Sequence, residues 1–395
     1  MFKISSDILS VSLIIILGIV SKNERIKMSL VRLIERLFTK NAKSTFIDAD
    51  FPHDDKIFYQ SFCKLMKYQY KAMQLNNMYR RRAMSELTKK EKFLLGKVGY
   101  FAKFDTIEDE HIAVNQKAIT QLLLSETQNN DFFELKDVAT DSQYLTPLSN
   151  ITESLNHLVR DYNEYYFANE VKPLVDYILN EIDGISTSNE IEIIVPGSGA
   201  GRIAYEISRS VKTSKVFSIE LNSLMYALNS SLYKCEEKLN IKPFILDYSN
   251  HLDLSDQTKS FEIITNNFEK PQNLELICDN FLKFIPCNTD NNKIGVVVTA
   301  FFMDTAENIL EYMEKIESMK KYYKRVHWIN IGPLKYGTRP KVVLTSNEWN
   351  IIRKERGWND QSLNCDVDKE IGYLTNYSGL YKGRYSLLKF HSIYE

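Results

Sequence analysis

A run of glycines in residues 191–201, IEIIVPGSGAG, carries the clearest chemical signal in this chain. Apolar residues typical of a buried strand end at Pro196, and Gly197, Gly199 and Gly201 follow at alternate positions. Glycine tolerates positive φ angles and has no side chain, so a backbone of this kind can approach a ligand closely. A strand that leads through glycines into a helix therefore indicates a site for a nucleotide-like ligand. A tight strand–helix turn without a ligand is the alternative.

An acidic residue, Glu220, ends the next strand-like run, KVFSIE, about twenty residues beyond the glycines. An acid at the tip of a second parallel strand can accept hydrogen bonds from the ribose hydroxyls of an adenosine. The glycine spacing is G-x-G-x-G, whereas the dinucleotide fingerprint is G-x-G-x-x-G, whose third glycine allows close helix–strand packing. The two features together favour S-adenosyl-L-methionine as the cofactor over a nicotinamide dinucleotide.

Three charged residues lie in patterns that fit either a structural or a functional role. Asp279, in ICDNFLKFI, could contact an adenine amino group or cap a helix. Asp304 follows a buried strand and could cap a helix that begins at Asp304 or Thr305, or orient an imidazole or amine beside the cofactor methyl group. Arg160 lies on a helix well before the glycines, and a lone helical arginine usually faces solvent.

Helical segments come first in the chain, and a mixed strand and helix pattern follows them. Apolar residues recur at helical spacing over residues 56–127 and 151–181, and residues 128–147 have the composition of a loop. After residue 186, short β-rich runs alternate with helical segments. This alternation predicts βαβ units, and hence an α/β fold with a parallel sheet covered by helices on both faces.

We therefore expect an N-terminal extension over residues 1–49, a helical cap region over 50–185 and an α/β domain over 186–395. Ligands of parallel sheets bind at the carboxyl ends of the strands, where the strand order reverses. The strand ends that could contribute to such a site are Gly197, Glu220, residues 301–304 and residues 330–333.

The overall composition narrows the choice of partners and compartment. The formal net charge of −1 gives no electrostatic reason to expect a nucleic-acid partner. The five cysteines are dispersed without a CxxC pair, which suits reduced thiols in a cytoplasmic or nuclear protein. No histidine and cysteine cluster has the spacing of zinc ligands, so we expect no metal.

An apolar run, ILSVSLIIILGIV, occupies residues 8–20. It is shorter than the roughly 20 residues that a membrane-spanning helix needs, and no signal-peptide cleavage site follows it. The alternatives are a membrane anchor, a buried or surface helix, and an extension that translation from Met28 would omit. The last two are favoured, because the cysteine usage argues against secretion.

Several segments together resemble the N2227-like methyltransferases, a family that includes carnosine N-methyltransferase. The segments are LVRDYNE (158–164), VPGSGAGRIAYEIS (195–208), SIE (218–220), CDNF (278–281), VVTAFFMDTAEN (297–308) and WINIGPLKY (328–336), with FYQSFCKLMKYQY near residue 60. The resemblance implies a Rossmann-like class I methyltransferase domain with a seven-stranded sheet and an N-terminal helical region. It also implies methyl transfer from S-adenosylmethionine to an imidazole nitrogen of carnosine, which gives anserine.

The resemblance assigns roles to particular residues of this chain. The cofactor would be bound by His157, Arg160, Gly197, Gly199, Glu220, Asp279, Asn280 and Ala300. Asp304 and Tyr385 would be catalytic and would bind the substrate, Asp304 by accepting the imidazole N–H and Tyr385, with Tyr336, by walling the ring. Gly337 stands at a third substrate-binding position.

Three of these positions depart from the family pattern. His157 replaces a glutamine, Ala300 replaces a cysteine, and Gly337 replaces a histidine that contacts the substrate. The loop over residues 337–343 is also shorter than in the family. The resemblance consequently supports the cofactor residues better than the substrate residues.

The loss of the histidine at Gly337 keeps other functions open. One is methylation of a peptide or protein histidine, or of another small amine. Another is a cofactor-binding fold that serves as a non-catalytic interaction module, and a nicotinamide dehydrogenase is the least favoured. A homodimer is an open alternative to a monomer.

Overall fold

The structure is a computed structural model that describes residues 53–127, 146–210, 212–287, 292–337 and 339–395. The expected N-terminal extension, including its apolar segment 8–20, lies outside these residues. Among the helices that are described, none combines the length and the apolarity required to cross a membrane.

A seven-stranded sheet forms the centre of the α/β part, with the strand order β5-β2-β1-β6-β7-β9-β8. The first five strands in this order run parallel, and β9 and β8 complete the sheet with antiparallel pairing. The bounds are β1 Ile191–Pro196, β2 Thr213–Glu220, β5 Leu274–Cys278, β6 Ile294–Ala300, β7 Arg325–Gly332, β8 Asn359–Gly372 and β9 Arg384–Tyr394. The predicted seven-stranded α/β sheet is thus confirmed.

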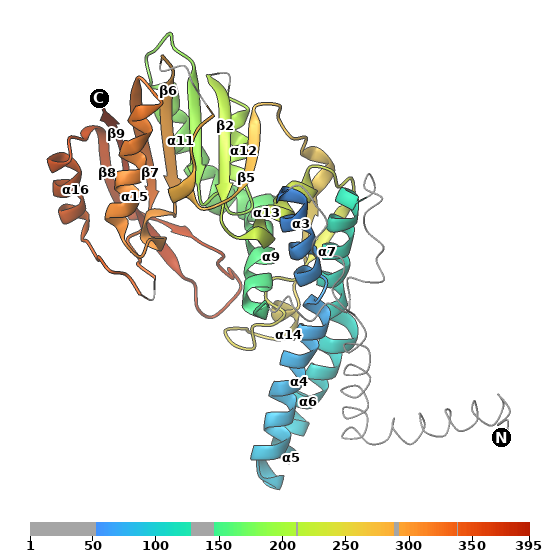
Figure 1. Ribbon diagram of the computed structural model, residues 1–395. Helices are drawn as coiled ribbons and strands as arrows, with labels where there is room; N and C mark the ends of the chain where they lie inside the picture. Colours follow the sequence, from blue (N-terminus) through green and yellow to red (C-terminus); the bar gives the residue numbers. More distant parts are fainter. Residues whose placement is uncertain (1–52, 128–145, 211, 288–291, 338) are drawn as a thin grey trace, which may run out of the picture. The chain divides into compact units, whose positions relative to one another are not determined.

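Helices cover both faces of this sheet (Figure 1). Successive residues of β1 point to opposite faces, as in any strand. Ile193 and Val195 belong to a hydrophobic cluster with helices α11 (Lys172–Asp183) and α12 (Arg202–Ser208). Ile194 belongs to a cluster on the other face with α15 (Ile309–Ser318) and α16 (Ser346–Glu355). Because both faces are covered, β1 is buried along its whole length, which explains its continuous apolar sequence.

The helical region packs against the α/β part through a third hydrophobic cluster. Phe62 of α3, Leu122 of α7 and Leu155 of α9 share this cluster with Leu228 of α13 and Ile263 of β4. The bounds of the helices are α3 His53–Leu65, α4 Tyr68–Glu86, α5 Lys89–Lys97, α6 Tyr100–Thr106, α7 Ile112–Thr127, α9 Leu148–Tyr162, α10 Glu164–Tyr166, α13 Ser223–Leu232 and α14 Leu254–Gln257. A separate antiparallel pair, β3 (Lys238–Ile241) and β4 (Phe261–Ile264), adjoins them. The division of the chain near residue 186 stays a prediction.

The sheet topology fixes where a ligand can bind. β1 pairs with β2 on one side and with β6 on the other, so the strand order reverses at β1. A crevice forms at the carboxyl ends of the strands that flank such a reversal. Gly197 follows β1, Glu220 ends β2 and Phe301 follows β6, so all three lie at this edge.

Candidate functional site

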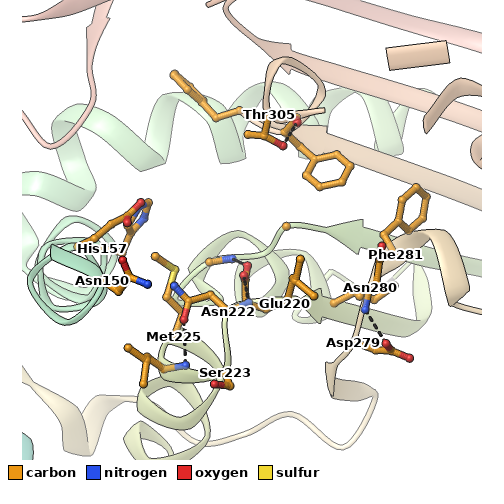
Figure 2. A pocket seen from close by; sticks show the side chains of 18 of the residues that line it. Asn150, His157, Glu220, Asn222, Ser223, Met225, Asp279, Asn280, Phe281 and Thr305 are labelled. Carbon is orange, nitrogen blue, oxygen red and sulfur yellow. Dashed lines mark hydrogen bonds between the residues drawn. The ribbon is translucent and has the colours of Figure 1, made fainter. Parts of the chain in front are cut away.

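A cavity of about 650 Å³ lies at this edge of the sheet. Helix α9 lines it on one side, and the loops after β1, β2, β5 and β6 line it on the other. Figure 2 shows Asn150 and His157 on one side, Asp279 and Asn280 on the opposite side, and Glu220 between them. Of the predicted cofactor residues, the cavity wall includes His157, Gly197, Gly199, Glu220, Asp279 and Asn280.

The glycines of the loop between β1 and α12 are needed for different reasons. Gly199 has φ +60°, and an added Cβ would meet only His157 Nδ1, at 3.7 Å. Its open side belongs to the cavity. Gly201 has φ +91°, and an added Cβ would lie 2.2 Å from Asn229 Nδ2. Gly199 therefore keeps the cavity clear, whereas Gly201 allows the loop to pack against α13.

Glu220 ties the end of β2 to the glycine loop. Its Oε2 accepts a hydrogen bond from the Gly199 N–H at 2.7 Å, and its Oε1 accepts one from the Asn222 N–H at 2.7 Å. Burial raises the pKa of this carboxyl, and the backbone hydrogen bonds act in the opposite direction. The cavity thus has an acidic acceptor group that backbone donors hold in place.

Asp279 and Asn280 divide the two roles that the sequence left open for Asp279. Asn280 Oδ1 accepts a hydrogen bond from the Leu282 N–H at 2.9 Å and so caps the short 3-10 helix Phe281–Lys283. Asp279 accepts from the Asn280 N–H at 2.6 Å and is exposed in the cavity wall. The capping residue is therefore Asn280, and Asp279 is left facing the cavity.

His157 and Arg160 lie on the buried side of α9. Burial, and then the charge of Arg160, lower the pKa of His157 to about 3, so its imidazole is neutral. The solvent-facing position that pattern alone gives to Arg160 is wrong, because this residue is 5% exposed. Apolar spacing identifies the buried face of a helix but cannot show that the face also holds an arginine with ionic partners.

The Arg160 guanidinium is enclosed by acids and rings. Its Nη1 lies 3.3 Å from Asp161 Oδ1, its Nε lies 3.6 Å from Glu170 Oε2, and the Tyr373 ring centroid is 4.4 Å from its Cζ. Within the described part of the chain, Arg160 Nε and Nη2 have no hydrogen-bond partner. Arg160 does not line the cavity itself but stands behind Tyr373, which does. It is a buried cation with donors to spare next to the cavity.

Asp304 lies beyond β6 in the short 3-10 helix Met303–Thr305. It is 8% exposed, and its Oδ2 accepts a hydrogen bond from the Lys335 N–H at 3.2 Å. Burial raises the pKa of Asp304 to about 6, although its hydrogen bonds oppose the shift. The expected start of an α-helix at Asp304 or Thr305 is wrong, because α15 begins at Ile309 and is capped by Asn308.

Other predicted substrate residues gather around Asp304 without lining the cavity. Gly337 donates its N–H to the Asp304 carbonyl oxygen at 3.3 Å, and an added Cβ there would meet no atom within 4 Å. Tyr385 of β9 accepts a hydrogen bond from Lys335 Nζ at 3.1 Å. Ala300 is the last residue of β6 and also lies outside the cavity wall.

Phe301 and Tyr373 join the cavity to the surroundings of Asp304, and the sequence did not single out either of them as a site residue. Their rings stack at 4.7 Å between centroids, and the Phe301 ring also meets the Tyr385 ring at 5.8 Å. Phe301 has φ +51°, a strained conformation for a residue with a side chain. Such strain is concentrated at functional sites. The strand-end position of Phe301 was the signal available, whereas Tyr373 follows a polar strand that gave none.

Comparison with known proteins identifies the family. A family model described as carnosine N-methyltransferase matches residues 138–395. The chain belongs to this family. S-adenosylmethionine is the cofactor of the carnosine N-methyltransferase family, so the prediction of this cofactor is confirmed. The assignment of the individual binding residues remains a proposal.

Individual relatives are similar to different extents. An uncharacterized protein of Saccharomyces cerevisiae is 29% identical over all of this chain and 99% of its own length. The carnosine N-methyltransferase of Schizosaccharomyces pombe is 27% identical over 51% of this chain, and that of Mus musculus is 25% identical over 48%. The matches span 56% and 48% of those two enzymes, about half of their length.

Solved structures with a similar arrangement include two methyltransferases. One is a SAM-dependent methyltransferase from Aquifex aeolicus, with a TM-score of 0.35, 13% identity, and coverage of 61% of this chain and 97% of that one. The other is magnesium protoporphyrin IX methyltransferase from Synechocystis PCC 6803 with bound SAM, with a TM-score of 0.33, 9% identity, and coverage of 70% and 97%.

The residues of the cavity fit S-adenosylmethionine. Gly199 leaves an open cradle, and Glu220 offers carboxylate oxygens at the end of β2. Arg160 has buried N–H groups without partners, which suit the carboxylate of an amino-acid moiety. Because His157 is neutral, it adds no positive charge beside a sulfonium.

Proposed function

We propose that this chain is an S-adenosylmethionine-dependent N-methyltransferase that methylates an imidazole nitrogen of carnosine or a related histidine-containing dipeptide, with anserine as the product from carnosine. Family membership over residues 138–395 is the observation that carries this proposal. The buried carboxylate of Asp304 next to Tyr385 and Lys335 supports it, because an imidazole needs an acceptor for its N–H.

The cofactor, when bound, supplies a methyl group on a positively charged sulfur. The part of the protein is mainly to hold the acceptor in position, because such a displacement needs little proton transfer before the methyl moves. Asp304 would accept a hydrogen bond from one ring nitrogen and so leave the lone pair of the other nitrogen free to attack. As the N–C bond forms, positive charge develops on the ring, and the Asp304 carboxylate would stabilise it.

The rings of Phe301, Tyr373 and Tyr385 would exclude water from this reaction. Their edge-to-face and stacked contacts form a continuous aromatic wall between the cavity and Asp304. A dry wall strengthens the interaction between Asp304 and a charged ring, since less solvent screens it. The strained backbone of Phe301 holds its ring within this wall.

A second candidate function is methylation of a histidine in a peptide or protein, or of another small amine. The observation that favours it is the open space at Gly337, where the family pattern has a histidine that contacts the substrate. A larger acceptor could occupy this space.

A methyl-transfer assay distinguishes the two candidates. The full chain is incubated with methyl-labelled S-adenosylmethionine and either carnosine, a histidine-containing peptide or a protein extract. We expect label in carnosine, at a ring nitrogen identified by mass spectrometry and comparison with anserine. Label in the peptide or extract but not in carnosine would replace the first function with the second. Binding of S-adenosylhomocysteine without transfer to any acceptor would contradict both.

A further inference from the structure

We propose that Lys335 forms a subsite for the α-carboxylate of the methyl acceptor, so that the enzyme selects free histidine-containing dipeptides over acceptors without that carboxylate. This inference rests on the proposed function and names the feature of the substrate that its site would recognise. It concerns a residue that neither the glycine loop nor the predicted substrate set includes.

Lys335 contacts both of the predicted catalytic residues. Its backbone N–H donates to Asp304 Oδ2 at 3.2 Å, and its Nζ donates to Tyr385 Oη at 3.1 Å. The same Nζ lies 5.4 Å from the centroid of the Tyr385 ring. The ammonium group is therefore held beside the place where Asp304 and Tyr385 would receive the imidazole.

The charge of Lys335 is not committed to any carboxylate. Among the described residues it forms no ion pair, and the hydrogen-bond partner of its Nζ is a phenol. Other lysines of the chain do pair: Lys341 Nζ lies 3.5 Å from Glu307, and Lys293 Nζ lies 2.7 Å from Glu192. The hydrogen bond to Tyr385 raises the pKa of Lys335, so the ammonium is charged at neutral pH. Lys335 is also exposed, and a ligand can therefore reach it.

The covalent structure of histidine places a carboxylate within reach of this ammonium. Only Cβ and Cα separate the imidazole ring from the carboxylate carbon, so a ring that binds Asp304 carries its carboxylate close to Asp304. Lys335 is adjacent to Asp304 through its own backbone hydrogen bond. In carnosine this carboxylate is free and charged, whereas inside a protein chain it is an uncharged amide. Charge-assisted hydrogen bonds are the strong ones, so the ammonium would favour the free carboxylate.

The test compares two acceptors that differ only in this group. Carnosine and β-alanylhistamine share the imidazole and the β-alanyl amide, but β-alanylhistamine lacks the carboxylate. We expect the unaltered chain to prefer carnosine by on the order of tenfold in kcat/KM. Lys335→Met should abolish this preference by raising KM for carnosine, with no change in kcat/KM for β-alanylhistamine. Lys335→Arg should retain most of the preference, because it keeps the charge.

Two controls separate recognition from a structural effect. Lys341→Met removes a neighbouring charge that is already paired with Glu307, and it should leave the preference unchanged. The affinity for S-adenosylhomocysteine should be the same in all variants. The preference should also weaken as salt concentration rises, since salt screens an exposed pair.

Several results would overturn the proposal. Equal kcat/KM for both acceptors in the unaltered chain would show that no carboxylate is read, while the proposed function would stand. An equal loss for both acceptors in Lys335→Met would assign Lys335 a structural role. Failure of the unaltered chain to methylate either acceptor would contradict the proposed function and, with it, the carboxylate subsite.

Discussion

The loop between β1 and α12 and the surface around Asp304 hold their functional groups in different ways. In the loop, backbone geometry does most of the positioning: Gly199 and Gly201 adopt positive φ angles, and Glu220 is fixed by backbone N–H groups. Around Asp304, side chains do it. Tyr385 is reached through Lys335 Nζ, and this arm of the site comes from strands far apart in the chain.

This difference explains why one side resists change and the other permits it. A substitution at Gly201 would collide with Asn229 and disturb the fold. A side chain at Gly337 would meet nothing, so this position can vary without structural cost. The methyl donor is therefore fixed by the architecture, whereas the acceptor can change through a few exposed residues. The predictions below test whether the two sides are separable.

The largest effect is expected for Asp304→Asn. The variant keeps the shape of the side chain but weakens the acceptor for the imidazole N–H and removes the negative charge. We expect kcat/KM for carnosine to fall by about 100-fold. The affinity for S-adenosylhomocysteine, measured by calorimetry, should not change, because Asp304 lies outside the cavity wall.

Glu307→Gln is the matched control for this variant, since it removes a nearby carboxylate that is exposed and paired with Lys341. It should retain full activity. If Asp304→Asn weakened cofactor binding as much as turnover, the separation of the two sides would be refuted.

The sequence predicted the cofactor side well because its signals are local. Gly197, Gly199 and Glu220 lie within one βαβ unit, and their spacing alone implies the loop that the structure shows. Parallel strands buried on both faces, such as β1 and β6, are equally clear because their sequences are continuously apolar.

Other features carried no such signal. The edge strand β8, Asn359–Gly372, pairs with β9 alone and is largely polar, so its sequence does not stand out as a strand. Tyr373, at its end, consequently escaped prediction as part of the cavity wall. The burial of Arg160 depends on Asp161, Glu170 and Tyr373, and two of these partners are distant in sequence. Contacts of this kind form only when the chain has folded.

The next largest effect concerns two glycines of the cofactor loop. Gly201→Ala should lower the free energy of unfolding by about 2 kcal/mol, because the new Cβ would lie 2.2 Å from Asn229 Nδ2. Gly199→Ala should lower it by only about 1 kcal/mol, the cost of a left-handed conformation without a collision. Urea unfolding of each variant measures these changes.

Ligand binding should separate the same two variants in the opposite order. The Cβ of Gly199→Ala points into the cavity, so its affinity for S-adenosylhomocysteine should fall by about tenfold. Folded Gly201→Ala should bind the ligand more tightly than Gly199→Ala does. Equal stability losses together with equal affinity losses would mean that the two glycines serve one purpose.

The smallest expected effect is a pH dependence that originates on the acceptor side. Burial raises the pKa of Asp304 from 3.8 to about 6, so its carboxylate is lost as the pH falls through about 6. Between about pH 7.5 and about pH 5.5, this protonation should reduce kcat at saturating carnosine by about fourfold, whereas an aspartate of ordinary pKa would cause almost no loss. A pH series of kcat measures the effect, and Asp304→Asn should lose this part of the profile.

Two titrations must be kept apart in that series. The imidazole of the free acceptor, with a pKa of about 6.5, also protonates in this range and steepens the fall of kcat/KM, but not that of kcat for the bound acceptor. Burial raises the pKa of Glu220 as well, so S-adenosylhomocysteine affinity over the same range reports the cofactor side. A kcat that falls in parallel with this affinity, and that keeps falling in Asp304→Asn, would place the titrating group at Glu220 and merge the two sides.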